Sequence, residues 1–419
     1  MKTISFIRNN QQVHNLTIYG FGQAFNLITP LLVIPYIISV CGLTNYGKAA
    51  FGMAMVFFLM VFVDFGSDIS GVKAVATNRD NPEHLRKILV TTYATKLLML
   101  FVVSAFMSLL FVLVPYFKKD SAMLFLTLPI LIGQFLNPSW FLQGIEDFGQ
   151  ITAINILSKV IYVGGIFGFI KLPQDFIYIN LWWGIGMIAS NAASFYYLYR
   201  RFQLNKYQAS INEIKAHLAS GFPIFSSQIF VSIQLYSPLI LIGFLGTAFL
   251  AGIYRVVDQV VVMFKTYILV FFNYVFPRVC YLLSTDTREG TRYWLLYNGF
   301  NFLFIAASMV LVYCNADRIV DYFTADNHQE IVNLLHLATA IPILMAISVP
   351  LKQLVLARNF NKYYVGVTMI VVILNVAMIL FLLPTIGIRG VLYALIITEL
   401  LTSALFILKI KKKPILHRF

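Results

Sequence analysis

The sequence has 419 residues, of which 59% are hydrophobic and 11% are charged, against roughly 45–50% and 25% in soluble domains. This composition excludes a soluble globular protein and predicts a polytopic membrane protein. The formal net charge is +14, but the basic residues lie between apolar runs, which is typical of membrane topology, so we expect no nucleic-acid partner.

Apolar runs long enough to cross a bilayer, about 20 residues each, recur along the whole chain. They predict an all-α protein with about twelve transmembrane helices. These lie near residues 16–38, 46–68, 88–114, 121–142, 151–171, 176–199, 219–243, 248–274, 293–314, 331–351, 363–384 and 387–408.

The first two runs are joined by a short segment with Gly42, Asn45 and Gly47, and they predict a membrane hairpin. The first helix contains the polar residues Gln23 and Asn26. Polar side chains persist at this depth only where protein or a watered cavity faces them. The two residues therefore indicate either a cavity wall that contacts substrate or close packing against neighbouring helices.

Three groups of residues form recognisable motifs. The first comprises Pro30, Leu31, Pro35 and Tyr36, then Gly42, Leu43, Tyr46 and Gly47, then Asp64, Phe65 and Gly66; the second comprises Asn137, Pro138, Trp140, Gln143, Gly144 and Glu146; the third comprises Gly252, Ile253, Tyr254 and Asp258. In these motifs the sequence resembles the polysaccharide transporter family. This family contains the flippases of lipid-linked oligosaccharides within the multidrug/oligosaccharidyl-lipid/polysaccharide exporter superfamily. The sequence departs from the family's pattern at Lys73, where we expect an arginine.

Basic residues gather on one set of loops. They are dense in the segments 73–87, 200–215, 278–292 and 352–362 and at both chain ends, and sparse in the other loops. By the positive-inside rule, the dense segments and both termini are cytoplasmic. For a member of the family that it resembles, this membrane is the bacterial cytoplasmic membrane.

The longest of these basic segments, 200–215, divides the predicted spans six and six. We therefore predict two six-helix bundles around a central cavity, formed by residues 1–205 and 206–419. The seventh span repeats the polar character of the first, with Ser220, Ser227 and Gln234 on one helix face. That face suits either a substrate-contacting cavity wall or helix packing.

Charged residues inside the spans are the candidates for function. A basic residue costs about 2.5–3.5 kcal/mol at a lipid-facing helix centre, so we expect each to face the protein interior, water or a partner charge. The basic residues inside the spans are Lys96, Lys159, Arg255 and Lys265. The acidic residues available there as partners are Asp64, Asp258 and Glu399.

The eighth span concentrates these charges in Arg255, Asp258 and Lys265. Spacings of three and seven residues place all three on one side of a helix. A functional interpretation is a basic wall for a phosphate-bearing ligand, since Arg binds phosphate with two parallel bonds and Lys adds a movable charge. The alternative is an Arg255–Asp258 pair that joins helices, with Lys265 reaching toward the cytoplasmic interface.

The other charged residues in the spans have no such spacing on one helix, and each is considered by its own neighbours. Lys96 is a candidate ligand group or extends to the interface, whereas Lys159, close to Asn155 and Ser158, favours an interior face. Glu399 and Asp64 are candidates for carrying a coupling ion or proton.

These features bear on three possible functions. The resemblance implies a flippase that moves an undecaprenyl-diphosphate oligosaccharide outward by alternating access, with lipids and possible assembly proteins as partners. The alternative is a cation-coupled multidrug and toxin extrusion transporter, but the first and seventh spans lack Asp and Glu. A membrane enzyme is disfavoured by short outer loops and an isolated His328. We expect neither a cofactor nor a metal.

Overall fold

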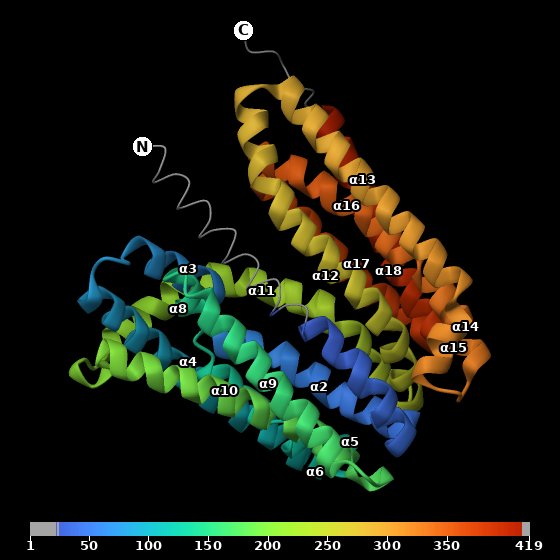
Figure 1. The fold of residues 1–419 in the computed structure, drawn as a ribbon, viewed down its shortest axis with the longest axis horizontal. Coiled ribbons are helices and arrows are strands. Elements are labelled where there is room, and N and C mark those ends of the chain that lie inside the picture. Colours follow the sequence, from blue (N-terminus) through green and yellow to red (C-terminus); the bar gives the residue numbers. More distant parts are fainter. Residues whose placement is uncertain (1–21, 23–24, 413–419) are drawn as a thin grey trace. The chain divides into compact units, whose positions relative to one another are not determined.

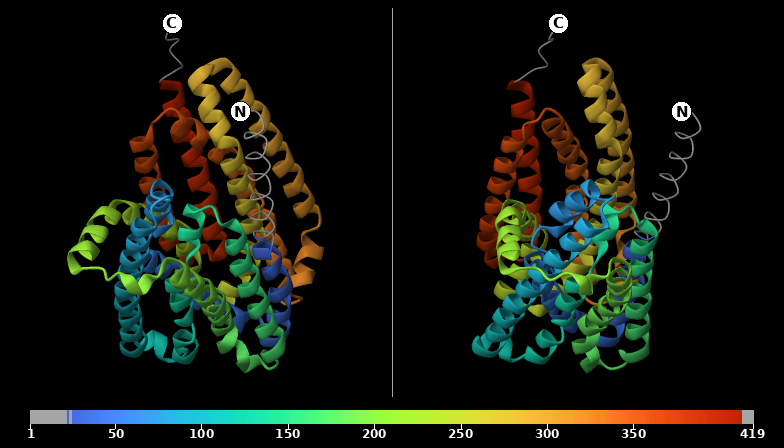
Figure 2. Two further views of the ribbon diagram at one scale, coloured as in Figure 1. Left: turned by 60° about the vertical axis from the view of Figure 1, so that its left-hand side comes forward. Right: turned by 90° about the vertical axis from the view of Figure 1, so that its left-hand side faces the viewer.

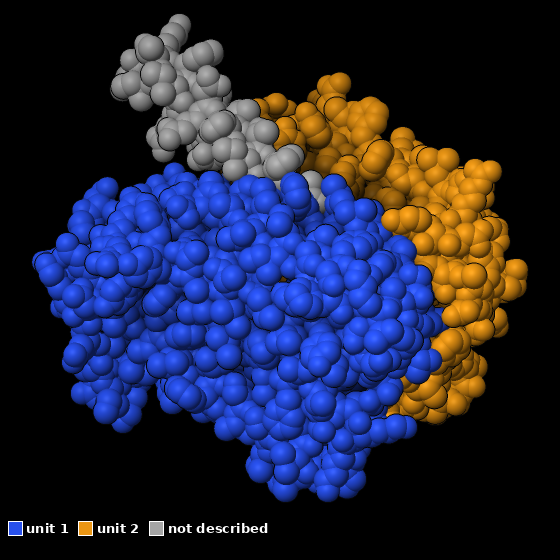
Figure 3. Space-filling view, turned by 60° about the horizontal axis from the view of Figure 1, so that its bottom comes forward, with its two compact units in different colours: residues 1–236 blue, residues 237–419 orange. Residues whose placement is uncertain are grey.

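The computed structural model describes Gly22 and residues 25–412, and all regular elements in that part of the chain are helices. The chain forms two compact units, Met1–Tyr236 and Ser237–Phe419 (Figure 3). Their boundary falls inside one long helix, α11 (Ile211–Leu245). The predicted domain division after residue 205 lies just before this helix and stays a prediction.

The first unit is built from helices of very different lengths. In chain order they are the helix Phe25–Cys41, α2 (Leu43–Asp64), α3 (Ser67–Thr77), α4 (Pro82–Leu113), α5 (Pro115–Lys118), α6 (Ser121–Phe125), α7 (Pro129–Leu136), α8 (Ser139–Gly144), α9 (Phe148–Phe169), α10 (Ile179–Phe202) and most of α11 (Figure 1). Helix α10 packs against both α7 and α9, and α2 packs against α4 and α7.

The residues Asp64, Phe65 and Gly66 form a sharp turn between α2 and α3. Both Phe65 (φ 45°) and Gly66 (φ 77°) adopt left-handed backbone conformations, which are costly for a residue with a bulky side chain. The Phe65 ring stacks on Phe225 of α11 with ring centroids 4.4 Å apart, and this contact holds the strained residue in place. The predicted span ends at residue 68. In the structure, helix α3 begins after the turn and extends beyond that residue to Thr77.

The second motif packs against this continuation. A Cβ atom on Gly71 of α3 would lie 2.6 Å from the Trp140 ring of α8, and one on Gly144 would lie 2.5 Å from Val75. These glycines therefore allow α3 and α8 to approach closely. Arg79, which follows α3, makes an ion pair with Glu146 at 3.1 Å. The second motif thus meets the segment that directly follows the first motif, although the two are far apart in the sequence.

The second unit contains longer and more regular helices. They are α12 (Ala248–Thr285), α13 (Thr287–Cys314), α14 (Ala316–Phe323), α15 (His328–Ala338), α16 (Ala340–Ala357), α17 (Asn361–Ile386) and α18 (Ile388–Lys412). Helix α12 packs against α13 and α16, while α18 packs against α16 and α17 (Figures 1 and 2). Thr247 and Asp286 cap the first two helices by accepting hydrogen bonds from backbone N–H groups.

Each of the predicted spans falls on helical segments, although the first begins outside the described residues and some spans, such as 121–142, are divided among shorter helices. Within residues 25–412, 10 helical stretches are long and apolar enough to cross a membrane. The helix Phe25–Cys41 is a shorter apolar helix, and α10 contributes a further 24 residues. The prediction of an all-α polytopic membrane protein is confirmed.

Candidate functional site

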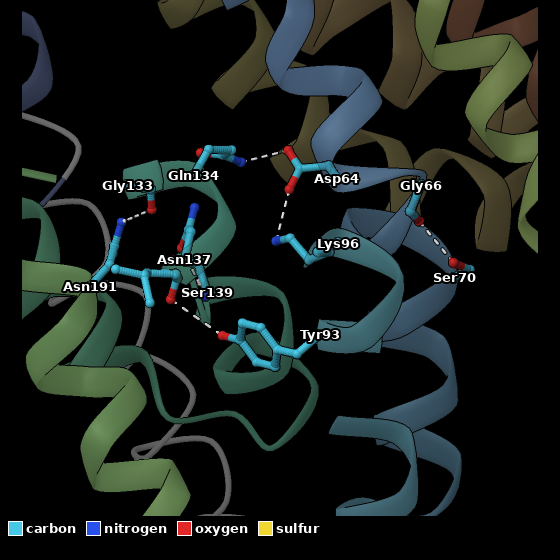
Figure 4. A network of polar contacts seen from close by, with 11 residues as sticks. Asp64, Gly66, Ser70, Tyr93, Lys96, Gly133, Gln134, Asn137, Ser139 and Asn191 are labelled. Atoms are coloured by element: carbon cyan, nitrogen blue, oxygen red, sulfur yellow. Dashed lines mark hydrogen bonds and ion pairs between the residues drawn. The ribbon is translucent and has the colours of Figure 1, made fainter. Parts of the chain in front are cut away.

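A buried ion pair lies in the first unit where α2, α4 and α7 meet. Lys96 Nζ lies 3.0 Å from Asp64 Oδ1, and Gln134 Nε2 donates a hydrogen bond to Asp64 Oδ2 at 2.5 Å (Figure 4). The side chains of Lys96 and Asp64 are 1% and 7% exposed. Asp68, near the start of α3, interacts electrostatically with both Asp64 and Lys96. Lys96 therefore does not extend to the interface, and it meets one of its predicted acidic partners.

The surroundings of this pair are also hydrogen-bonded to the backbone. Tyr93, one turn before Lys96 on α4, donates its hydroxyl to Leu136 O at 3.3 Å. Asn191 Nδ2 of α10 donates to Gly133 O at 2.8 Å (Figure 4). Such a network fixes α2, α4, α7 and α10 to one another, because breaking any member would leave a buried polar group without a partner. The contacts make a structural role for Lys96 and Asp64 plain, and their predicted ligand and coupling roles stay predictions.

A cavity of about 200 Å³ lies beside this network, within the first unit. It is lined by Phe57 and Met60 of α2, Asn137 and Ser139 at the start of α8, Ile154, Asn155, Ser158 and Lys159 of α9, Trp183, Met187, Ser190 and Asn191 of α10, and Tyr236 of α11. Lys159 Nζ lies 3.4 Å from the centroid of the Trp183 ring, a cation–π contact. The expectation that Lys159 faces the interior thus agrees with its place in this wall.

Small residues let α9 and α10 come close enough for this contact. A Cβ atom on Gly165 would lie 2.2 Å from the Trp182 ring, and one on Gly186 would lie 2.5 Å from Ser158 O. Small residues are the usual means by which membrane helices approach each other. The α9–α10 contact therefore depends on residues that carry no polar signal of their own.

In the second unit, the charges of the eighth span lie on α12. Arg255 Nη1 lies 3.0 Å from Asp258 Oδ2, and Lys265 Nζ lies 4.0 Å from Asp258 Oδ1. The three side chains are 15–25% exposed, so they are neither fully buried nor free in solvent. One carboxylate thus faces two cations, and the group carries a net positive charge. Spacing on one helix correctly brought the three residues together.

A second charged group in this unit surrounds Glu399 of α18. Ser348 Oγ of α16 donates to Glu399 Oε2 at 2.6 Å, and Lys265 and Lys352 both interact electrostatically with the carboxylate. Lys352 lies inside α16, with Nζ 5.5 Å from the Phe272 centroid and 4.9 Å from the Tyr364 centroid. In the sequence, Lys352 opens the basic segment 352–362, and nothing in that pattern indicates its place in this group.

The neutral candidates are more dispersed. Gln23 lies outside the described residues. Asn26, near the start of the helix Phe25–Cys41, and Gln234, in α11, are both half-buried. Neither lines the cavity described above.

Several residues of the cavity were not found from the sequence. Trp183, Asn191 and Tyr236 are uncharged residues in apolar helices, and a single such residue gives no periodic signal. The pair Trp182–Trp183 among Asn180, Ser190 and Asn191 was the available clue, because α10 is the most polar of the predicted spans.

Comparison with known proteins identifies relatives over most of the chain. The family described as "Polysaccharide biosynthesis protein" matches residues 13–282. A protein of Escherichia coli (strain K12) named "Putative O-antigen transporter" is 21% identical over 398 residues, covering 94% of this chain and 95% of the relative. A Shigella dysenteriae protein of the same name is 23% identical over 304 residues, covering 71% and 75%.

Solved structures share the fold at lower identity. The lipid II flippase MurJ in an inward closed conformation has a TM-score of 0.75 and 16% identity, covering 95% of this chain and 88% of that one. An inward-facing multidrug resistance MATE family transporter of the MOP superfamily has a TM-score of 0.71 and 14% identity, covering 92% and 95%. Both are two-lobed transporters, so the predicted fold class is confirmed.

Proposed function

The chain belongs to the polysaccharide biosynthesis protein family, and on this premise we propose that it is a flippase for lipid-linked oligosaccharides. Its substrate would be an undecaprenyl-diphosphate oligosaccharide, moved from the inner to the outer leaflet of the bacterial cytoplasmic membrane by alternating access. The exported unit would serve the assembly of a surface polysaccharide such as O-antigen, capsule or exopolysaccharide. Membrane lipids and other assembly proteins would be its partners.

The charged face of α12 is the observation that carries this proposal. Arg255 and Lys265 share the Asp258 carboxylate, so two cations lie together on one face of α12 where an incoming anion could be bound. A guanidinium fork fits two phosphate oxygens at once, and an ammonium supplies a movable third contact. Because a positive charge at membrane depth is costly, an anionic ligand that offsets it would bind with a gain in free energy.

The lysines of both units add to this arrangement. Lys159 lines the cavity of the first unit, and Lys352 joins Lys265 near Glu399 in the second. In the proposal these cations attract the anionic substrate, while Lys96 stabilises the fold through Asp64. Glu399 and Asp64 are the acidic groups whose neutralisation would couple transport to an ion or a proton.

The membrane potential would favour the proposed direction. A diphosphate carries about two negative charges, and each is worth about 2.3 kcal/mol per 100 mV of potential. With the inside negative, outward movement of the anion is downhill unless cations of the protein move with it. On electrostatic grounds, outward movement of the substrate therefore needs no energy source other than the membrane potential.

The alternative of a cation-coupled multidrug and toxin extrusion transporter fits the charges less well. Such a transporter needs a carboxylate that a cationic ligand can reach. Within the described residues, Asp64 is paired with Lys96 and Asp258 with Arg255, and Glu399 is within the influence of two lysines. The resemblance to MATE structures is one of fold.

Deletion of the protein in its native host tests the proposal. We expect loss of a surface glycan, accumulation of its lipid-linked unit in the inner leaflet, and recovery of both when the wild-type chain is supplied. A deletion strain with normal surface glycans and no accumulated intermediate would refute the proposed function.

A further inference from the structure

We propose that the cavity of the first unit binds an acidic sugar, one that carries a carboxylate such as a uronic acid. The inference rests on the proposed function, because it assigns this cavity to the sugar part of the lipid-linked substrate. It concerns a different place in the molecule from the charged face of α12. The charge, the polar atoms and the aromatic surfaces of the cavity each match such a ligand.

The charge comes from Lys159. Its ammonium group touches the Trp183 ring, but no carboxylate lies within ion-pair distance of it among the described residues. Lys48, Lys87, Lys96 and Lys265, in contrast, each meet a carboxylate. A cation–π contact offsets only part of the cost of holding a cation in a membrane helix. An anion entering the cavity would complete the pairing.

The polar atoms indicate a ligand that also carries hydroxyl groups. Asn191 is 3% exposed, and it donates from Nδ2 to Gly133 O, while its Oδ1 accepts no hydrogen bond. A buried acceptor without a donor is unfavourable, and a ligand hydroxyl would satisfy it. Asn155 and Ser158 line the same cavity one turn or less from Lys159 on α9. Amide and hydroxyl groups around one cation match a polyhydroxylated anion.

The aromatic surfaces complete the match. Phe57 lies 5.7 Å from Trp183 and 6.0 Å from Tyr236 between ring centroids, so the three rings form one continuous wall. Ligand sites of this kind combine aromatic walls with a few placed polar groups. A sugar ring has an apolar face of C–H groups for such a wall, together with hydroxyls for the amides.

The same features argue against the diphosphate as occupant. A diphosphate bears about twice the charge of a carboxylate and no apolar face, whereas the cavity offers one cation and three aromatic rings. The two cations on α12 fit the diphosphate better. The inference therefore assigns the acidic sugar to this cavity and leaves the diphosphate to the charged face of α12.

The inference is tested by titrating the purified full-length chain in lipid nanodiscs with sodium D-glucuronate, D-glucose and inorganic pyrophosphate at constant ionic strength. Tryptophan fluorescence reports binding, and the variant Trp183→Phe identifies the part of the signal that comes from this cavity. We expect glucuronate to bind about tenfold more tightly than glucose, which corresponds to one charge-assisted hydrogen bond. Pyrophosphate should leave the Trp183 signal unchanged.

Variants of Lys159 make the result specific. Lys159→Gln should reduce the preference for glucuronate to less than about threefold, and Lys159→Arg should retain it because the charge remains. Lys118→Gln, the loss of one exposed lysine that does not line this cavity, should leave the preference unchanged. The melting temperature of each variant shows that the protein is folded.

Equal binding of glucose and glucuronate, no binding of either, or an unchanged preference in Lys159→Gln would overturn the inference. Pyrophosphate displacing glucuronate at Trp183 would do so as well, because the cavity would then belong to the diphosphate. The titration requires no export, so its result is independent of the deletion experiment that decides the proposed function.

Discussion

Lys96 and Asp64, from helices α4 and α2, form an ion pair of 3.0 Å with side chains that are 1% and 7% exposed. At this depth neither charge has water to replace its partner. Removing one side of a buried pair strands the other and costs about 3–5 kcal/mol. The pair thus stabilises the first unit only as long as both members are present.

We predict that Lys96→Met lowers the free energy of unfolding of the purified protein by about 3–5 kcal/mol. The loss arises because Asp64, which is 7% exposed, would then lack the cation that pairs with it. Adding Asp64→Asn to Lys96→Met should recover part of the stability. Thermal unfolding followed by circular dichroism measures both effects.

The control for this experiment is the pair Lys48–Asp120, which has a distance of 2.8 Å but side chains that are 23% and 29% exposed. Lys48→Met should cost only about 0–1 kcal/mol, as expected for an exposed pair. Equal losses from the two lysine substitutions would show that burial does not set the strength of the Lys96–Asp64 pair.

The neighbouring glycines of α9 allow a test of helix packing beside the cavity. Gly165→Ala should destabilise the protein by about 1–3 kcal/mol through overpacking, because the new Cβ would lie 2.2 Å from the Trp182 ring. Gly164→Ala should be neutral or slightly stabilising, since nothing lies within 4 Å of its Cβ position and Ala favours helices. The melting temperatures of the two variants test this prediction. A lower melting temperature for Gly164→Ala than for Gly165→Ala would contradict the described α9–α10 contact.

The topology is a further prediction. Reporter fusions after Lys118, at the end of α5, and at Asp326, between α14 and α15, should read as external. Fusions in the segments 73–87, 200–215 and 352–362 should read as cytoplasmic, because basic residues are concentrated there. A cytoplasmic signal from Lys118 or Asp326 would require a different number of spans.

The features that could be predicted from the sequence are those whose absence would cost much free energy in a membrane. A charge in a span needs a partner, and for Lys96 and Arg255 the partners Asp64 and Asp258 were both among the few acidic residues available. Helix spacing alone placed Arg255 beside Asp258. The twelve apolar runs were recognisable for the same reason, since polar residues that face lipid cost free energy.

Features that carry little energetic penalty left no such signal. Gln134, Trp183 and Asn191 are neutral, so nothing in the sequence linked them to Asp64 or Lys159. Lys352 was assigned to a loop because the apolar run ends there, whereas α16 continues to Ala357. The end of a hydrophobic run marks the edge of the membrane, and a helix can extend beyond it, as α3 also does.

Substitutions of Arg255 distinguish ligand binding from a salt bridge with Asp258 within α12. If it binds phosphate, Arg255→Ala should abolish glycan export in the host while the protein remains folded and inserted, and Arg255→Lys should retain part of it. Arg389→Gln, a loss of one exposed arginine at the start of α18, should export normally. Normal export by the double variant Arg255→Gln with Asp258→Asn would instead assign Arg255 to the salt bridge alone, because neither Arg255 nor Asp258 would then be a charge left without the other.

Translocation by the purified protein tests the central claim most directly. Vesicles containing the chain and an undecaprenyl-diphosphate oligosaccharide in one leaflet are sampled with an enzyme or lectin that reaches only the opposite leaflet. We predict rapid appearance of the oligosaccharide on the opposite side with wild-type protein, and no more than the protein-free rate with Arg255→Ala. Equal rates in protein-free and wild-type vesicles would contradict the account.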